Sequence, residues 1–325
     1  MEDHDKDDDR LHRIRHSLAH VLAQAVLELR PGSTLGFGPP IDDGFYYDFI
    51  LSEPLTEDDF PALEKKMKHI IKLGQKFERE ELPKADALAR IDEMGEPYKR
   101  EYAQELIEKK GLDQLTFYRN GPFLDMCDGP HVDSTRELPK GAFKLRSVAG
   151  AYWRGDSDNA MMTRIYAWAF ESKEQLVNAL YRQCKAELMD ALLRDFAFDA
   201  TPREQHRAFF HRMVGFFRAR PEVFDFLELH HHQPYLDADN LARERQALAP
   251  VLAFFAHGRS AQLTRAMPAE ALAAIVWGAF SGLMKAARLG HLEADDALWA
   301  QAESCAWNAV RRGDPANETP KEPEP

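Results

Sequence analysis

The chain has 325 residues, of which 44% are hydrophobic, and a formal net charge of −12. This length is enough for about two domains with ordinary hydrophobic cores. The negative charge argues against a general nucleic-acid binder, because phosphate contacts need clustered Lys and Arg. Three cysteines at unrelated spacings imply no disulfide framework.

The first ten residues are acidic and contain no apolar segment. We therefore expect no signal peptide and no ordered structure over residues 1–10. The rest of the chain shows no run of eighteen apolar residues, so we expect no membrane span and a cytoplasmic location.

Two histidines, His16 and His20, lie on a predicted helix. Apolar residues recur around them at helical spacing: Ile14, Leu18, Val21, Leu22, Ala25, Val26 and Leu29. Residues four apart project from the same face of a helix, so both imidazoles are expected to point to one place. Ser17 follows the first histidine where a zinc protease would carry a general-base Glu, so that motif is not met.

A second pair, Cys127 and His131, has the same spacing, but Gly129 and Pro130 between them favour a tight loop. Three imidazoles and one thiol can close on a single point, either as a zinc site or as a pocket that positions water. The alternative is that a His pair four residues apart is only structural or exposed.

The segment that follows this loop is basic despite the negative chain. Between residues 136 and 164 six basic residues, Arg136, Lys140, Lys144, Arg146, Arg154 and Arg164, outnumber three acidic ones. A polyanion that binds over the loop is expected to contact this segment first. The alternative is that the segment is an ordinary solvated surface of mixed charge.

The second half reads as a series of helices. Thr201 to Glu204 form a capping box that opens the first of them. Later helices are predicted over residues 271–289, with small Gly278, Ser281 and Gly282 suited to close packing, and over 297–310. The triple histidine 230–232 is interpreted as polarity at a helix end rather than as a metal clamp, and residues 313–325 as a disordered tail.

Six motifs of the first half occur in one order: His16–His20, Gly38–Asp48, Gly95–Lys99, Asp125–Val132, Phe143–Leu145 and Ala149–Asp156. In order and spacing they resemble the editing domain of threonyl-tRNA synthetase, a domain type that also occurs in alanyl-tRNA editing proteins. The resemblance implies an α+β domain over residues 11–170. It also implies that this domain meets the tRNA acceptor end and hydrolyses mischarged seryl-tRNA(Thr).

The same resemblance implies roles for individual residues. The catalytic set would be His16, His20, Lys99, Cys127 and His131, while Tyr47 and Asp125 would bind substrate, Asp125 through the amino group. No cofactor is required by this reading; the alternative is zinc held by His16, His20, Cys127 and His131. Asp128 departs from the Arg that the family often carries. There is no room for an aminoacylation core, so neither an ATP site nor tRNA charging is expected.

Residues 171–312 resemble the all-helical C-terminal domain of TetR-type transcriptional regulators. The resemblance implies a homodimer through residues 271–289 and 297–310, with Trp277, Phe280 and Trp299 supplying buried area; the alternative is that these residues fill the domain's own core. No helix-turn-helix has room before residue 171, so sequence-specific DNA binding is not expected. Two other readings stay open: a ligand-sensing or dimerising module with the first half as a passenger, and a non-functional chimera.

Overall fold

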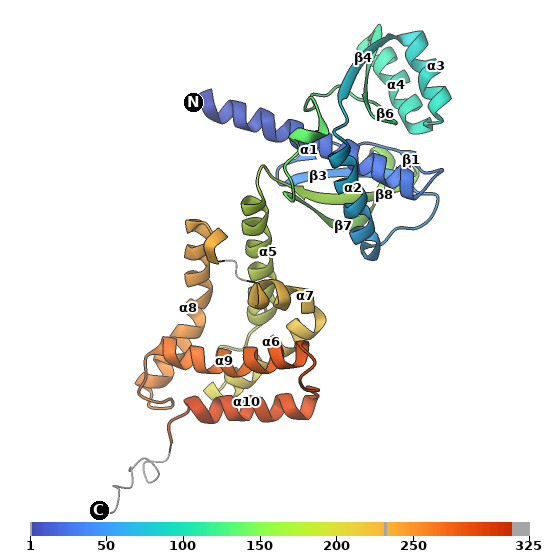
Figure 1. The fold of residues 1–325 in the computed structure, drawn as a ribbon. Coiled ribbons are helices and arrows are strands. Elements are labelled where there is room, and N and C mark those ends of the chain that lie inside the picture. The colour runs from blue at the N-terminus through green and yellow to red at the C-terminus, as the bar shows by residue number, and fades with distance from the viewer. Residues whose placement is uncertain (1, 231–232, 314–325) are drawn as a thin grey trace, which may run out of the picture. The chain divides into compact units, whose positions relative to one another are not determined.

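A computed structural model describes residues 2–230 and 233–313 of the chain (Figure 1). The chain forms two compact units, Met1–Leu176 and Val177–Pro325. The first contains both sheets and the second is built from helices, in agreement with the predicted α+β domain followed by an all-helical domain.

A five-stranded antiparallel sheet is the centre of the first unit. Its strands are β1 (Thr34–Leu35), β2 (Pro40–Ile41), β3 (Gly44–Ile50), β7 (Phe143–Tyr152) and β8 (Met161–Ala169), in the order β1-β3-β8-β7 with β2 paired to β3. Helices α1 (Glu2–Leu29) and α2 (Phe60–Leu73) pack against it (Figure 1). Leu18 and Leu22 of α1 are fully buried in one core with Phe45, Phe49 and Ile165 of the sheet.

A smaller antiparallel sheet lies in the same unit, with β4 (Phe77–Pro83), β5 (Gln114–Asn120) and β6 (Phe123–Met126) in that order. Helices α3 (Lys84–Met94) and α4 (Pro97–Lys110) cover it, with Ala87, Ile91 and Ala103 buried against Phe117. Gly95 ends α3 with a φ of 70°, a left-handed conformation that favours glycine. The turn lets α4 start at once and places Lys99 in its first turn. The remaining short turns are the 3-10 helices η1 (Glu57–Asp59), η2 (Thr135–Glu137) and η3 (Trp153–Gly155).

The second unit consists of helices around one core. They are α5 (Lys173–Leu193), which begins in the first unit, α6 (Pro202–Ala219), α7 (Pro221–Phe224) with a π-helical turn (Asp225–Leu229), η5 (Gln233–Tyr235), α8 (Ala238–Ser260), α9 (Ala269–Arg288) and α10 (Asp296–Val310). The predicted capping box is present: Thr201 N donates to Glu204 Oε2 over 3.0 Å, and Glu204 N donates to Thr201 Oγ1 over 3.4 Å. These two bonds satisfy amide groups that a helix start leaves free.

Two expectations about the chain ends have different outcomes. Residues 2–10, expected to lack structure, belong to α1, which begins at Glu2. The expected disordered tail at 313–325 lies outside the described residues except for Gly313.

The predicted roles of the large aromatic residues of α9 and α10 are partly wrong. Phe280 and Trp299 are almost fully buried in the core of their own unit, so they supply no area to a partner. Gly278 and Gly282 are exposed instead, and a Cβ atom added to either would meet nothing within 4 Å. The two glycines therefore lie on an open face of α9, whereas Ser281, also expected to allow close packing of helices, is buried.

One helix contrasts with the expectation that no segment resembles a membrane span. Among the described residues, α9 is long and apolar enough to cross a membrane, with a mean hydropathy of 1.2. Its residues Leu272, Val276, Phe280 and Met284 are buried in the core of the helical unit, and core helices commonly have this composition.

Candidate active site

The four residues whose side chains can bind a metal ion come together in the first unit. His16 and His20 project from α1, and Cys127 and His131 from the loop after β6. Cys127 Sγ lies 3.1 Å from His16 Nε2 and 3.4 Å from His131 Nε2. One ligand atom from each of the four residues lies within 4.8 Å of all the others. The helix and the loop thus bring together the two pairs that the sequence separates by more than a hundred residues.

His131 is held on two sides. Its Nδ1 is hydrogen-bonded to Ser17 Oγ over 3.1 Å, and Ser17 Oγ also accepts the amide of Val132 over 3.1 Å. The ring of Phe77 stacks on the imidazole with 4.9 Å between centroids. Sequence reasoning treated Ser17 only as a mismatch to another motif, although its position beside His16 on the helix placed it next to the site.

A buried charged group forms the second part of the site. Lys99 Nζ lies 2.8 Å from Asp125 Oδ1 and 3.0 Å from Oδ2, and Tyr47 OH donates to Oδ2 over 2.5 Å. His20 Nε2 is 3.8 Å from the same oxygen and so connects this group to the histidines. Lys99, Asp125 and Tyr47 are each at most 3% exposed. Every residue in the predicted catalytic and substrate-binding sets therefore belongs to one cluster.

Glu96 is a further buried acid near this cluster that sequence reasoning did not select. Its Oε2 accepts the amide of Leu35 over 2.7 Å, so it links the start of α4 to β1. Burial raises the pKa of Glu96 to about 7, and the negative charge of Asp125 acts in the same direction. Its place between Gly95 and Pro97, just before a helix, was the available signal.

Burial also sets the protonation of the cluster. Together with repulsion between neighbouring imidazoles, it lowers the pKa of His16 to about 4 and that of His131 to about 2. The pKa of His20 is likewise well below its usual value because of burial. Burial beside Asp125 raises the pKa of Cys127 to about 12. At neutral pH the metal-free cluster therefore holds neutral imidazoles, which can accept a proton, and a protonated thiol.

The basic segment after the loop presents less free charge than its sequence indicated. Four of its six cations are in ion pairs: Lys144 with Glu64 (2.9 Å), Arg146 with Asp43 (3.3 Å), Arg154 with Glu105 (2.6 Å) and Arg164 with Asp48 (2.7 Å). Within the part of the chain that the structure describes, Arg136 and Lys140 have no such partner.

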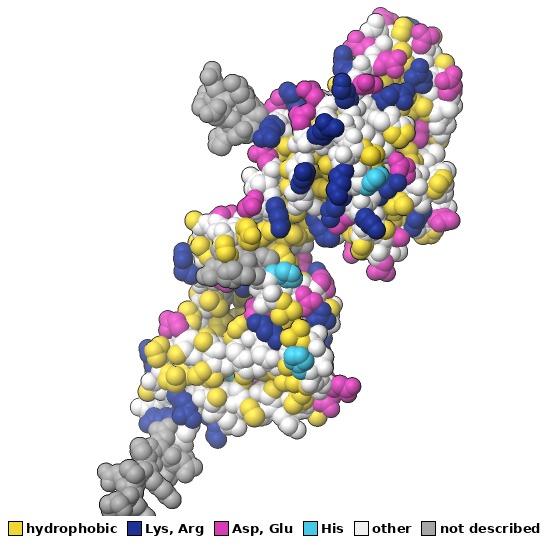
Figure 2. All heavy atoms as spheres, in the orientation of Figure 1, with side chains coloured by type: hydrophobic (Ala, Val, Ile, Leu, Met, Phe, Trp, Pro, Cys, Tyr) yellow, Lys and Arg dark blue, Asp and Glu magenta, His cyan; other side chains and the backbone are white. Residues whose placement is uncertain are grey.

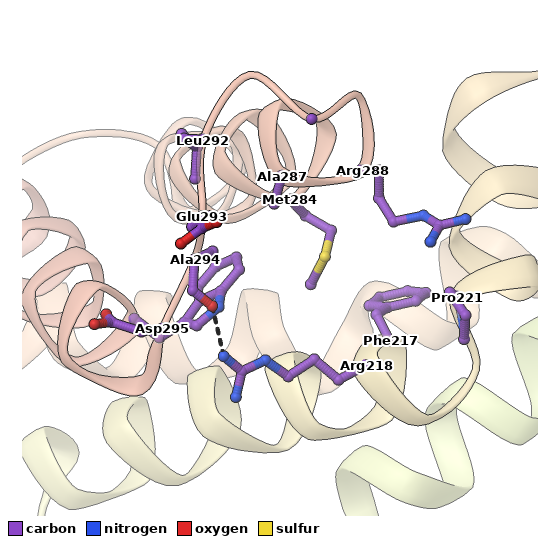
Figure 3. A pocket seen from close by; sticks show the side chains of 12 residues that line it. Phe217, Arg218, Pro221, Met284, Ala287, Arg288, Leu292, Glu293, Ala294 and Asp295 are labelled. Atoms are coloured by element: carbon purple, nitrogen blue, oxygen red, sulfur yellow. Dashed lines mark hydrogen bonds between the residues drawn. The ribbon is translucent and has the colours of Figure 1, made fainter.

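The helical unit has a separate open hollow of about 810 Å³. Phe217 and Met284 form apolar walls, and Arg218 donates to the carbonyl of Ala294 over 2.7 Å at the rim (Figure 3). Trp299 also lines the hollow, and its buried indole Nε1 has no hydrogen-bond partner among the described residues. The hollow thus offers an apolar wall flanked by the charged residues Arg218, Arg288, Glu293 and Asp295.

The first unit is therefore an α+β domain with a buried pocket of neutral histidines, a thiol and a Lys–Asp pair, and the second is a helical domain. Residues 115–166 match the family described as threonyl and alanyl tRNA synthetase second additional domain. Residues 181–312 match the family described as tetracyclin repressor-like, C-terminal domain. The two matches fall on the two parts of the chain for which the sequence predicted these resemblances.

The similar proteins are of two kinds. The threonine–tRNA ligase of Maricaulis maris is 50% identical over 185 residues, which are 57% of this chain and 28% of that protein. That of Hyphomonas neptunium is 44% identical over 212 residues, 64% of this chain and 32% of that protein. The chain thus spans less than a third of either ligase. A solved TetR family transcription regulator from Marinobacter aquaeolei VT8 is 26% identical with a TM-score of 0.41, over 44% of this chain and 75% of that one.

Proposed function

We propose that the first unit is an aminoacyl-tRNA deacylase that hydrolyses seryl-tRNA(Thr), without aminoacylation activity. The observation that carries the proposal is the convergence of His16, His20, Cys127 and His131 with the Lys99–Asp125 pair on one site. This site lies in the half of the chain that resembles threonine–tRNA ligases. Hydrolysis of an aminoacyl ester needs an attacking water, a base and an oxyanion partner; the imidazoles can act as the base and Lys99 as the oxyanion partner.

In the proposed reaction a water attacks the ester carbonyl and gives its proton to a neutral imidazole of the cluster. The ammonium of Lys99 lies near the developing oxyanion and stabilises it. The bond between the carbonyl carbon and the ribose oxygen breaks, the ribose oxygen takes the proton, and free serine and tRNA leave. Asp125 holds Lys99 and binds the amino group of the substrate. The pocket must refuse threonine, which differs from serine by one methyl, worth about 1–3 kcal/mol in a binding site.

We propose that this chemistry requires no resident metal, with zinc as the alternative. The donor set of three imidazoles and one thiol fits zinc by type and number. His16, His20, Cys127 and His131 would hold the ion, and it would supply an activated water. Metal analysis of the purified protein, with activity measured before and after a chelator, separates the two cases. Stoichiometric zinc whose removal abolishes hydrolysis would overturn the metal-free version.

The proposal is tested by following ester loss from seryl-tRNA and threonyl-tRNA with the whole chain. We expect seryl-tRNA to be hydrolysed at least ten times faster. His16→Ala combined with Cys127→Ala should abolish the reaction, while His291→Ala, an exposed histidine of the helical unit, should leave it unchanged. Equal rates for the double variant and the parent would exclude this site.

We further propose that the chain forms a homodimer through the exposed faces of α9 and α10, acts in the cytoplasm and does not read DNA sequence. Besides Gly278 and Gly282, the exposed small residues Ala274 of α9 and Ala297, Ala300 and Ser304 of α10 support the dimer, because they allow close approach of helices. A mobility shift with random and operator-like duplexes at physiological salt tests DNA binding, and a salt-resistant, sequence-dependent shift would contradict the proposal.

A second candidate function is ligand sensing by the helical unit, favoured by the hollow with its apolar wall of Phe217 and Met284. The ligand would be largely apolar. Titration with the apolar fluorophore 8-anilinonaphthalene-1-sulfonate should show saturable binding that Ala287→Arg, which fills the hollow, weakens. A chain with neither this binding nor ester hydrolysis would be the non-functional chimera.

A further inference from the structure

A stripe of basic side chains runs along the exposed face of α2. Lys65, Lys68, His69 and Lys72 are all exposed and recur at positions i, i+3, i+4 and i+7, the spacing of one helix face. We name these four residues the α2 stripe. The opposite face is apolar and buries Leu63, Met67, Ile70 and Ile71 in the core of the unit. In the space-filling view, Lys and Arg gather over this part of the first unit (Figure 2).

Few acidic side chains of the protein neutralise the charges of the α2 stripe. Lys68 lies 3.9 Å from Glu64, a carboxylate that already pairs with Lys144 at 2.9 Å. Lys65 and Lys72 have no acidic partner within the described residues. By contrast, most cations of the basic segment after the site are paired. Like charges at helical spacing repel one another, so a bound polyanion would relieve a repulsion that the fold leaves in place.

The carboxyl end of the stripe is joined to the candidate site. Gln75, just after α2, accepts the amide of Thr135 over 2.9 Å, and Thr135 Oγ1 donates to Ile71 O over 3.2 Å. Phe77, two residues further on, stacks on His131. Arg136, which follows Thr135, has its side chain against Gly74, where an added Cβ would meet its Nε. Arg136 therefore continues the stripe toward the site.

We infer that the α2 stripe, with Arg136, binds the phosphate backbone of the RNA stem that carries the ester into the site. This inference rests on the proposed function. Lys65 and Lys72 are seven residues apart, about 10 Å along a helix, which is enough to follow several phosphates of one strand. The surface does not fit a membrane, because α2 turns its apolar face to the core and leaves only Leu73 of its large apolar side chains exposed.

The test compares two charge-matched variants of the whole chain. Lys65→Glu/Lys68→Glu/Lys72→Glu removes the stripe. Lys84→Glu/Lys109→Glu/Lys110→Glu makes the same charge change at exposed lysines of α3 and α4. Binding of uncharged tRNA is measured over a range of salt concentrations. Hydrolysis is measured on seryl-tRNA and on a seryl ester of adenosine, which has no stem.

We expect the stripe variant to bind tRNA at least ten times more weakly than the control variant, and to show a salt dependence smaller by about two to three phosphate contacts. Its kcat/KM on seryl-tRNA should fall through KM, while the adenosine ester is hydrolysed as by the parent. Lys65→Ala/Lys68→Ala/Lys72→Ala should show the same effects to a smaller extent, and thermal unfolding checks that all variants fold.

The outcomes are distinguishable from those of the proposed function. If the parent hydrolyses neither ester, the deacylase proposal fails, while tRNA binding still decides on the stripe. If stripe and control variants bind tRNA equally, the inference is wrong. It is also wrong if the stripe supports binding to phosphatidylserine vesicles but not to tRNA.

Discussion

Lys99 and Asp125 form a buried ion pair, 2.8 Å between Nζ and Oδ1, although they lie on α4 and on β6. Both side chains are at most 3% exposed, so neither charge can be solvated if its partner is removed. The pair joins the start of a helix to a strand of the smaller sheet and holds the only ammonium group found in the described cluster. Its first role is therefore to hold α4 and β6 in position at the site.

Lys99→Met should destabilise the protein by about 3–5 kcal/mol, because it leaves the carboxylate of Asp125 buried without a cation. Lys99→Met together with Asp125→Leu should recover part of this loss, since no charge then remains buried. Thermal unfolding of the parent, of Lys99→Met and Asp125→Leu alone, and of the double variant measures the coupling. If the double variant loses as much as the two single ones added, the pair does not act as a unit.

Ser17→Ala should lower kcat on seryl-tRNA by about ten- to a hundredfold, because His131 loses the hydroxyl that fixes its ring. KM should change little, since Ser17 is fully buried and does not face substrate. Ser17→Thr keeps the hydroxyl and should restore most of kcat. A loss shared equally by both variants would show that volume, not the hydrogen bond, matters at this position.

The histidines of the metal-free site should make the folded protein lose stability at a pH above the range in which carboxyl groups usually titrate. In the folded state the pKa of His16 is about 4 and that of His131 about 2, whereas unfolded histidine titrates near 6.5. As the pH falls from 6.5 to 5, the unfolded chain takes up protons that the folded site refuses. The free energy of unfolding therefore falls, by about 1.4 kcal/mol per pH unit for each such histidine.

Glu96 acts in the opposite direction over the same range, because its pKa is raised to about 7 and the folded state keeps the proton longer. Because three histidines have a larger effect than one carboxyl group, the free energy of unfolding should still increase with pH over this range. Denaturant unfolding at pH 7.5, 6 and 5 gives the slope, and His16→Asn should flatten it. A stability that does not change between pH 6.5 and 5 would contradict the burial argument.

Glu96→Gln isolates the carboxyl group. The amide oxygen can still accept the Leu35 amide, but it does not titrate. As the pH rises through 7, the parent must ionise a buried acid and loses stability, and the variant does not. Relative to the parent, the variant should therefore be more stable at pH 8 than at pH 5.5, by about 2 kcal/mol. Glu108→Gln, at an exposed position of α4, should show no such difference.

Local spacing predicted the helix with His16 and His20, the loop between Cys127 and His131, and the Thr201 cap. Each of these depends on residues within four positions of each other. The charge of the basic segment was misjudged because its partners are remote: Arg164 and Asp48 are 116 residues apart. Helical periodicity also predicted that Phe280 and Trp299 are buried, but it cannot tell a domain's own core from an interface between subunits.

The proposed dimer can be tested at Gly282 with little risk to the fold. Gly282 is exposed in the middle of α9, and a Cβ atom there meets nothing within 4 Å of the same chain. Gly282→Glu should therefore leave the subunit folded, and replacing a glycine inside a helix should even stabilise it by up to about 1 kcal/mol.

In a two-fold interface the same position comes close to its copy or to α10 of the partner, so two glutamates would be forced into a packed apolar contact. Light scattering should show a dimer for the parent and a monomer for Gly282→Glu at micromolar concentration, with unchanged helix content. Gly215→Glu, a glycine of α6 with equally free space around its Cβ, serves as the matched control and should remain dimeric. A parent that is monomeric, or a Gly282→Glu variant that stays dimeric, would mean that the small-residue face of α9 is not the contact between subunits.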